Sequence, residues 1–328
     1  MRFFEQQQAA RVQTARLLVL FALTVLALVV AVNFALGLTW RVVSGGHDYP
    51  AYFFAINTVM TLVFVLGGWW IESAALDGGG EKLARRAGAR EARPLMHEAE
   101  HRFCNIVSEL AIASSIKAPT PMVLQRIDSI NAFACGWDAN DAVVAVTQGA
   151  LDHLTRDELQ GLVAHEFSHI REGDMQLNMR LAGMVSGLEM IFNLGQTMCE
   201  ADDLRNRSVL ALPGFAIKAA GSLGWLAGRA LSAAVSRQRE FLADAKAVQF
   251  TRSKDGLGGV LRKALGQGDS MRALHPSVQH MLLVSAQTEG HWFDTHPPMA
   301  ERIRRIYGKP MLALSLDDAL PTRPDAIF

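Results

Sequence analysis

Two long uncharged runs near the N-terminus limit what this chain can fold into more than any other feature. Residues 17–38 read LLVLFALTVLALVVAVNFALGL, and residues 51–71 read AYFFAINTVMTLVFVLGGWWI. A helix of about 20 apolar residues crosses the hydrocarbon core of a bilayer, so we expect a transmembrane hairpin. A cleaved signal peptide is the alternative for the first run, although that run is long for a signal peptide and a second span follows it directly.

Basic residues lie mainly outside this hairpin. The loop between the two runs carries only Arg41, whereas the flanks carry Arg2, Arg11, Arg16, Lys82, Arg85, Arg86, Arg90 and Arg93. By the positive-inside rule, both ends of the hairpin are cytoplasmic. We therefore expect a multi-pass protein of the cell inner membrane, in which residues 1–16 and everything from residue 94 onward begin on the cytoplasmic side. The three scattered cysteines agree with a reducing compartment.

Residues 72–93, ESAALDGGGEKLARRAGAREAR, are predicted to be a flexible and then basic juxtamembrane linker. The linker arginines either contact anionic lipid headgroups or serve only as a topology signal. Over the whole chain the charge is balanced, with 32 basic and 32 acidic residues, so no general attraction to nucleic acid is expected. The lipid bilayer is the partner that this region predicts, and the sequence does not indicate the oligomeric state.

The pattern H-E-x-x-H occurs twice, in MHEAEHR at residues 96–102 and in VAHEFSHI at residues 163–170. On a helix, positions i and i+4 share one face, so two imidazoles can reach one metal ion. The glutamate is offset by one residue and faces a water molecule at the metal. Both copies meet these requirements, so the flanking residues must decide between them.

The first copy is predicted to lie on an exposed helix. Apolar residues recur there at spacings of three and four, as in a buried stripe: Leu95, Ala99, Phe103, Ile106 and Leu110. His97 and His101 lie off this stripe, among charged neighbours that would not exclude water. We interpret this copy as a coincidence, with adventitious metal capture in a purified sample as the alternative.

The second copy is predicted to lie on a buried helix. Thr155 and Glu158 form a capping-box pattern that starts the helix, and Gly173 is a typical C-terminal stop. The residues between are apolar nearly all round, which indicates burial. Two histidines and a carboxylate inside such a helix need a partner, and a metal ion is the obvious one.

A catalytic zinc site needs a third protein ligand. Glu240 in SRQREFLADAKAV is the best candidate, and Asp244 lies one turn further on the same helix. Asp244 could accept the free N–H of a ligand imidazole. The alternative is a surface pair of acidic residues that balances Arg237 and Arg239.

Three separated motifs, VAHEFSHIREGDM, SRQREFLAD and THPPMAERI, occur in this order along the chain. With INAFACG and the hairpin, they closely resemble the HtpX-like membrane zinc metallopeptidases, relatives of the CAAX prenyl proteases. The resemblance implies a mainly α fold with a small β-sheet, an α+β arrangement in which a gluzincin-like peptidase domain (residues 94–328) follows the hairpin. It implies one zinc ion per chain, held by His165, His169 and Glu240. It further implies that Glu166 is the catalytic glutamate and that Asp244 supports a ligand histidine.

The family also implies two further hydrophobic spans, for which residues 181–198 and 209–235 are the candidates. Charged residues interrupt both segments, which makes insertion costly unless those residues face a bundle or a cavity. Membrane insertion is therefore one interpretation. A helical hairpin that lies on the membrane or roofs the active site is the other.

Two further segments are candidates for contact with substrate. His296 in DTHPP is a candidate donor to the reaction intermediate because the resembling proteins place this histidine near the site, and the alternative is an ordinary loop residue. Asn131, Ala132 and Phe133 in NAFACG are candidates for an edge strand that holds an extended peptide. An ordinary core strand is the alternative for that segment.

These observations predict a membrane-anchored zinc metalloendopeptidase that cleaves polypeptide substrates, membrane or misfolded proteins, on the cytoplasmic side. One alternative is a catalytically silent membrane scaffold that keeps the peptidase fold. The presence of both H-E-x-x-H and E-x-x-x-D argues against that alternative. A zinc hydrolase that acts on something other than a peptide is the second alternative, and only the family resemblance argues against it.

Overall fold

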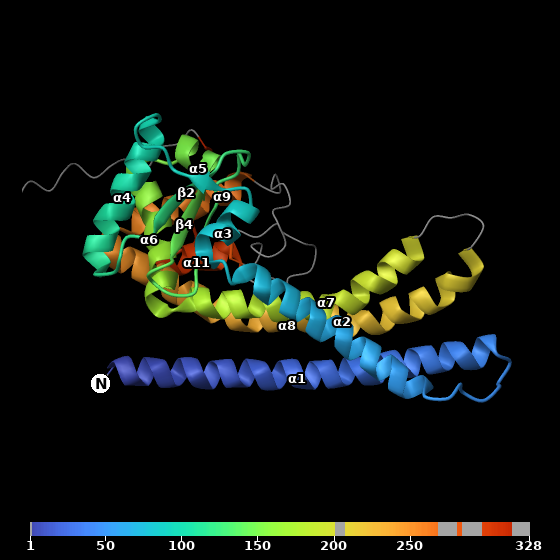
Figure 1. Ribbon diagram of the computed structural model, residues 1–328. Coiled ribbons are helices and arrows are strands. Elements are labelled where there is room, and N and C mark those ends of the chain that lie inside the picture. The colour runs from blue at the N-terminus through green and yellow to red at the C-terminus, as the bar shows by residue number, and fades with distance from the viewer. Residues whose placement is uncertain (1, 201–206, 268–280, 284–296, 317–328) are drawn as a thin grey trace, which may run out of the picture. The chain divides into compact units, whose positions relative to one another are not determined.

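A computed structural model of the chain describes residues 2–200, 207–267, 281–283 and 297–316, and the side chains of residues 16–200, 212–233, 239–267, 281–283 and 297–316 (Figure 1). The described chain is mostly helical, with one small sheet. Its elements are α1 (Arg2–Val43), α2 (Phe53–Leu76), α3 (Gly79–Arg86), β1 (Arg90–Glu91), α4 (Glu98–Ser114), β2 (Thr120–Leu124), β3 (Ala132–Cys135), β4 (Val143–Thr147), α5 (Gln148–His153), α6 (Arg156–Glu172), α7 (Asp174–Glu200), α8 (Arg207–Thr251), α9 (Lys254–Gln267) and α11 (Met299–Tyr307).

The chain forms two compact units. Unit 1 comprises Met1–Ala75 and Arg180–Ser232, and unit 2 comprises Leu76–Met179 and Ala233–Phe328. Unit 1 therefore holds α1, α2 and the larger parts of α7 and α8. Unit 2 holds the sheet, the remaining helices and the whole of the second H-E-x-x-H copy.

The helices of unit 1 pack through an apolar core to which all four contribute. The buried members are Phe21, Val25, Leu28, Val32, Val65, Met184, Leu188, Ile191 and Ala220. Two glycines bring the backbones close together: a Cβ on Gly187 would lie 2.6 Å from the carbonyl oxygen of Val65, and one on Gly224 would lie 2.5 Å from that of Leu188. Figure 1 shows α7 and α8 running side by side over this part of the chain.

Both uncharged runs are helical, as the sequence predicts. Arg16–Val43 and Phe53–Leu76 are long and apolar enough, by length and composition, to cross a membrane, and they are the two stretches of described helix that meet this measure. Residues 181–198 and 209–235 are also helical, within α7 and α8. Their insertion into a membrane stays a prediction.

The sheet of unit 2 has four strands in the order β1-β2-β4-β3. Strand β2 is parallel to β4, whereas β1 pairs antiparallel with β2 and β3 pairs antiparallel with β4. The sequence VVAVT forms β4. Segment NAFACG contributes β3, which lies at an edge of the sheet, so the edge position predicted for this segment is confirmed.

Helix α6 packs against strand β3 and between helices α4 and α9. Gly161 lets α6 approach α9 closely, because a Cβ on this residue would lie 2.3 Å from the backbone nitrogen of Leu257. The space beside Gly161 is thus filled by the start of α9. This close contact fixes the helix that carries the second H-E-x-x-H copy against the rest of unit 2.

Residues 72–93 differ from the flexible linker that the sequence suggests. They contain the end of α2, helix α3 and strand β1, and Leu83 and Ala84 of α3 are buried. The backbone nitrogen of Gly80 donates to Asp141 Oδ2 at 3.1 Å, and a Cβ on Gly80 would lie 2.5 Å from the carbonyl oxygen of Cys135. The glycine run therefore permits tight packing next to β3, a requirement that composition alone does not distinguish from flexibility.

Candidate metal centre

Helix α6 is fixed at both ends by the residues that the sequence indicates. The Thr155 hydroxyl accepts a hydrogen bond from the Glu158 backbone nitrogen, and the Glu158 carboxylate accepts one from the Thr155 nitrogen, so the capping box is complete. At the other end Gly173 adopts a left-handed conformation with φ of 74°. Between these caps, His165 and Glu166 are 1% exposed, which confirms that the helix is buried.

Three ligand atoms converge at one point of unit 2. His169 Nε2 lies 3.2 Å from His165 Nε2 and 3.4 Å from Glu240 Oε1, and His165 Nε2 lies 3.6 Å from Glu240 Oε2. These three residues are the group of metal-ligand side chains found within the described residues. Glu240 is brought to α6 by helix α8, about 70 residues further along the chain.

The other nitrogen of each imidazole faces a carboxylate. His165 Nδ1 lies 3.1 Å from Asp244 Oδ1, and His169 Nδ1 lies 2.9 Å from Asp174 Oδ2. A carboxylate at Nδ1 holds the proton there and leaves Nε2 as an acceptor. Two imidazole lone pairs and one carboxylate then point at one another, an arrangement that a cation stabilises.

The spacing of these atoms suits a tetrahedral ion. Two ligands at about 2.1 Å from a zinc ion, at tetrahedral angles, lie about 3.4 Å apart. The two imidazole Nε2 atoms lie 3.2 Å apart, and each lies 3.4 or 3.6 Å from a different oxygen of the Glu240 carboxylate, close to this value. Two histidines and a carboxylate also form a donor set used at catalytic zinc sites, so the residues fit the metal that the sequence implies.

The electrostatic surroundings favour positive charge at the histidines. Burial lowers the pKa of His169, but Asp174 and Glu240 raise it by more, so the pKa lies well above its ordinary value. Burial likewise lowers the pKa of His165, and hydrogen bonding to Asp244 and Glu240 more than compensates, so that pKa is raised too. A site that attracts protons in this way also attracts a metal cation.

Glu166 is placed to exchange a proton next to this cluster. Its carboxylate oxygen Oε2 is buried and has no hydrogen-bond partner among the described residues. Burial raises the pKa of Glu166, and the neighbouring histidines lower it by less. A small cleft opens here, lined by residues from α6, α7, α8, the sheet and the segment 281–283: Ala134, Glu166, His169, Asp174, Asn178, Arg239, Glu240 and Met281.

Arg302 also belongs to the site, although no pattern in the sequence singles it out. It is fully buried and donates from Nε and Nη2 to the two carboxylate oxygens of Asp244, at 2.9 and 2.7 Å. Its Nη1 lies 3.3 Å from Glu240 Oε2. Burial by itself raises the pKa of Asp244, but Arg302 outweighs this and holds it at about 2, so Asp244 stays ionised.

Asp174 is a second residue that the sequence did not single out. One carboxylate oxygen faces His169 and the other pairs with Arg239, the residue before Glu240. The signal that could have found it is its position directly after Gly173, where the helix stops and the chain turns back. The alternative of a surface pair for Glu240 and Asp244 is wrong, because both are 4% exposed.

The predicted substrate contacts lie partly within this region. Ala132 and Phe133 belong to the buried edge strand β3. Asn131 is fully buried, and its side-chain oxygen accepts the hydrogen bond of the Ala132 backbone nitrogen at 3.0 Å. A direct contact of these three residues with substrate stays a prediction. His296 lies outside the described residues.

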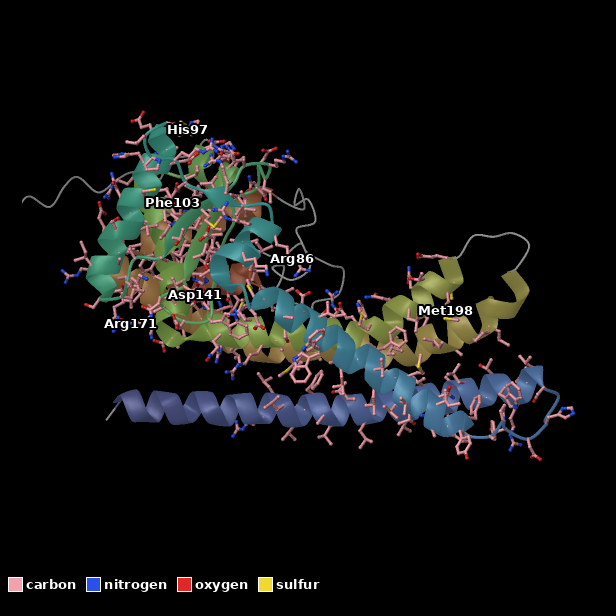
Figure 2. The ribbon with its side chains drawn as sticks, viewed as in Figure 1. Arg86, His97, Phe103, Asp141, Arg171 and Met198 are labelled. Carbon is pink, nitrogen blue, oxygen red and sulfur yellow. The ribbon has the colours of Figure 1, made fainter. Side chains whose placement is uncertain are left out.

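The first H-E-x-x-H copy forms no comparable site. His97 is the N-cap of α4 and lies at the edge of unit 2 in Figure 2, whereas Phe103 points into the core. His101 is exposed, and neither histidine belongs to a metal-ligand group within the described residues. The predicted place of Leu95 in the buried stripe is wrong, because Leu95 is 99% exposed. Among the charged neighbours of His97 and His101, which the sequence predicts to be exposed, Glu100 is buried and paired with Arg90.

In a metallopeptidase site, a helix supplies two histidine ligands and a catalytic glutamate, and a third ligand comes from elsewhere in the chain. The buried helix α6 and the carboxylate of Glu240 have this arrangement. The chain belongs to peptidase family M48, whose model matches residues 98–309. It is similar to a protease HtpX homolog of Ligilactobacillus salivarius, with 36% identity over 62% of this chain and 71% of that protein. It is also similar to a protease HtpX homolog of Dictyoglomus thermophilum, with 33% identity over 77% of this chain and 83% of that protein. A homolog of Streptococcus gordonii is 30% identical over 92% of this chain and 98% of that protein. The chain is thus an HtpX-like protease. No solved structure matches it.

Proposed function

We propose that the chain is a zinc-dependent metalloendopeptidase of the gluzincin type. His165, His169 and Glu240 would hold one zinc ion, which when bound polarises a peptide carbonyl and acidifies a water molecule. The observation that carries this proposal is the convergence of His165, His169 and Glu240, each of which offers one ligand atom within 4.8 Å of the others. Asp244 and Asp174 keep the imidazole protons on Nδ1, and Arg302 keeps Asp244 ionised.

Glu166 does the proton transfer in this proposal. Its buried carboxylate takes a proton from the attacking water and returns it to the departing amine. A pKa raised by burial suits both steps, because a general base works best when its pKa lies near the operating pH. The cleft that Glu166 lines also contains Ala134 of the edge strand, so an extended polypeptide could reach the metal along β3.

We further propose that unit 1 is embedded in a membrane. Large apolar side chains face outward not only on α1 and α2 but also on α8, where Phe215 is 67% exposed and Leu212 is 44% exposed. Exposed apolar surface of this extent marks contact with lipid or protein. Two basic residues of the α7–α8 hairpin have aromatic neighbours: Lys218 Nζ lies 5.6 Å from the Phe192 ring, and the Arg229 guanidinium lies 5.0 Å from the Trp225 ring.

In this arrangement residues 17–38 and 51–71 would span the bilayer, and α7 and α8 would cross it as a second hairpin. The peptidase part, from about residue 94 onward, would lie on the cytoplasmic side by the positive-inside rule. Cys199, exposed near the end of α7, tests this directly. A membrane-impermeant maleimide added to intact spheroplasts should label Cys199 and fail to label a Cys199→Ser variant. Labelling only after lysis would refute the second crossing.

The enzymatic proposal is tested by metal content together with cleavage. Purified protein should contain one zinc per chain, and it should cleave casein until a chelator removes the metal, with recovery when zinc is returned. Zinc without cleavage of casein or of labelled peptides would favour a silent scaffold. Cleavage that survives complete removal of the metal would refute the zinc-dependent mechanism.

A further inference from the structure

Strand β3 pairs with β4 along one edge, and a segment of the same chain contacts its other edge, next to the metal-ligand cluster. The backbone nitrogen of Leu283 donates to the carbonyl oxygen of Ala132 at 3.1 Å. The short segment Met281–Leu283 is buried, with exposures of 6, 3 and 1% along its length. It therefore lies where an added strand would pair with the sheet.

The pairing of β3 with β4 shows which backbone groups face this edge. The Thr147 nitrogen donates to the Asn131 carbonyl, so alternate residues from Asn131 turn their backbone groups toward β4. Ala132 and Ala134 consequently turn theirs outward. Both outward groups of Ala132 are taken: its nitrogen donates to the Asn131 side chain and its carbonyl accepts from Leu283.

Met281, two residues before Leu283, places the segment at the cluster. It lines the cleft together with Ala134, Glu166 and His169. The Leu283 carbonyl accepts a hydrogen bond from Arg302 Nη1 at 3.1 Å. The segment is thus held on one side by the edge strand and on the other by the arginine that bridges Asp244 and Glu240.

We propose that Met281–Leu283 is an internal segment that competes with an extended polypeptide for the edge of β3. This inference rests on the proposed function, since it assumes that substrate pairs with the same edge. A polypeptide that binds at Ala132 must first displace Leu283. The segment would therefore restrain the free enzyme, and substrates with long unfolded stretches would displace it more readily than short ones.

Binding of fluorescein-labelled casein to the full-length Glu166→Gln protein tests the competition without cleavage. In this background, Leu283→Pro removes the backbone N–H donor. Leu283→Val is the matched control, because valine keeps this donor and has a side chain about as large as that of proline. The proline form should bind casein about fivefold more tightly than the valine form, the factor that one ordinary hydrogen bond contributes. Equal or weaker binding by a folded proline form would overturn the proposal.

An engineered disulfide between the segment and β3 tests the proposal if the proline variant does not fold. A backbone hydrogen bond of 3.1 Å joins Leu283 to Ala132, so cysteines at these two positions are candidates for a disulfide. An Ala132→Cys/Leu283→Cys double variant should bind casein weakly when oxidised and recover on reduction, whereas single Leu283→Cys should not respond. Unchanged binding by the oxidised form would also overturn the proposal. The peptidase function is judged separately, by zinc content and cleavage by the wild-type protein.

Discussion

The two H-E-x-x-H copies have the same pattern and opposite surroundings. In the second, His165 is 1% exposed and a carboxylate from another helix completes a set of three ligand atoms. In the first, His97 is a solvent-exposed N-cap without a side-chain capping bond, and the buried group is Glu100, at a position that the pattern ignores. The pattern thus indicates which residues could share a helix face, while burial and a distant third ligand decide whether they form a site.

The largest difference between the copies should appear when the glutamate of each is replaced. Glu166→Gln should lower the rate of casein cleavage by about 1,000-fold, because the proton acceptor is lost, while zinc content stays the same. Glu98→Gln changes an exposed side chain and should leave both properties as they are. Steady-state cleavage with metal analysis measures this, and an active Glu166→Gln enzyme would remove the assigned base.

Replacing the residue that faces a histidine Nδ1 in each copy should give a smaller difference, which appears in zinc affinity. Asp174→Asn removes the charge that faces His169 Nδ1 and should weaken zinc affinity by about 10- to 100-fold. Competition with a calibrated zinc chelator measures this affinity. Asn105, which lies 3.4 Å from His101 Nδ1 in the first copy, provides the matched variant Asn105→Ala. Equal zinc affinity in the Asp174 variant and the wild type would show that Asp174 does not support the ligand.

Within the first copy, stability rather than metal binding should depend on Glu100. Glu100→Gln weakens its bonds to Arg90 and to the Arg93 nitrogen and should cost about 2 kcal/mol of unfolding free energy. Arg90 holds the pKa of Glu100 below its ordinary value. The ionised form therefore stabilises the fold above the unfolded-state pKa of about 4.3, and this contribution is lost as the pH falls through the lower folded-state pKa. Denaturant unfolding should show the difference from wild type shrinking in acid; a constant difference would contradict the ion pair.

Substitutions at the N-caps of α6 and α4 should give the smallest difference between the two copies, measured as a change in stability. Thr155→Ala removes the side-chain bond that caps α6 and should destabilise the protein by about 1 kcal/mol. His97→Ala, at the N-cap of α4, removes no such bond and should change the unfolding midpoint little. Thermal unfolding of the two variants compares them, and equal shifts would mean that the capping box does not contribute.

Local features of the site could be predicted from the sequence, whereas features made by distant contacts could be predicted only where a separate motif marked them, as SRQREFLAD marks Glu240 and Asp244. The capping box and the Gly173 stop depend on residues within a few positions of each other, so Thr155 and Glu158 could be identified directly. Arg302 could not, because its partner Asp244 lies 58 residues away and the helix MAERIRRIY has a basic, surface-like composition. The burial of Glu100 could not be predicted for a different reason: its partner Arg90 is only 10 residues away but belongs to a stretch that resembles a linker.

Zinc content of two matched variants tests the central claim most directly. His165→Ala should lose the metal and casein cleavage together, whereas a His97→Ala/His101→Ala double variant should keep one zinc per chain and wild-type activity. Inductively coupled plasma mass spectrometry on freshly purified protein measures the metal. Retention of zinc by His165→Ala, or its loss from the double variant, would contradict the assignment of the metal site to the second copy.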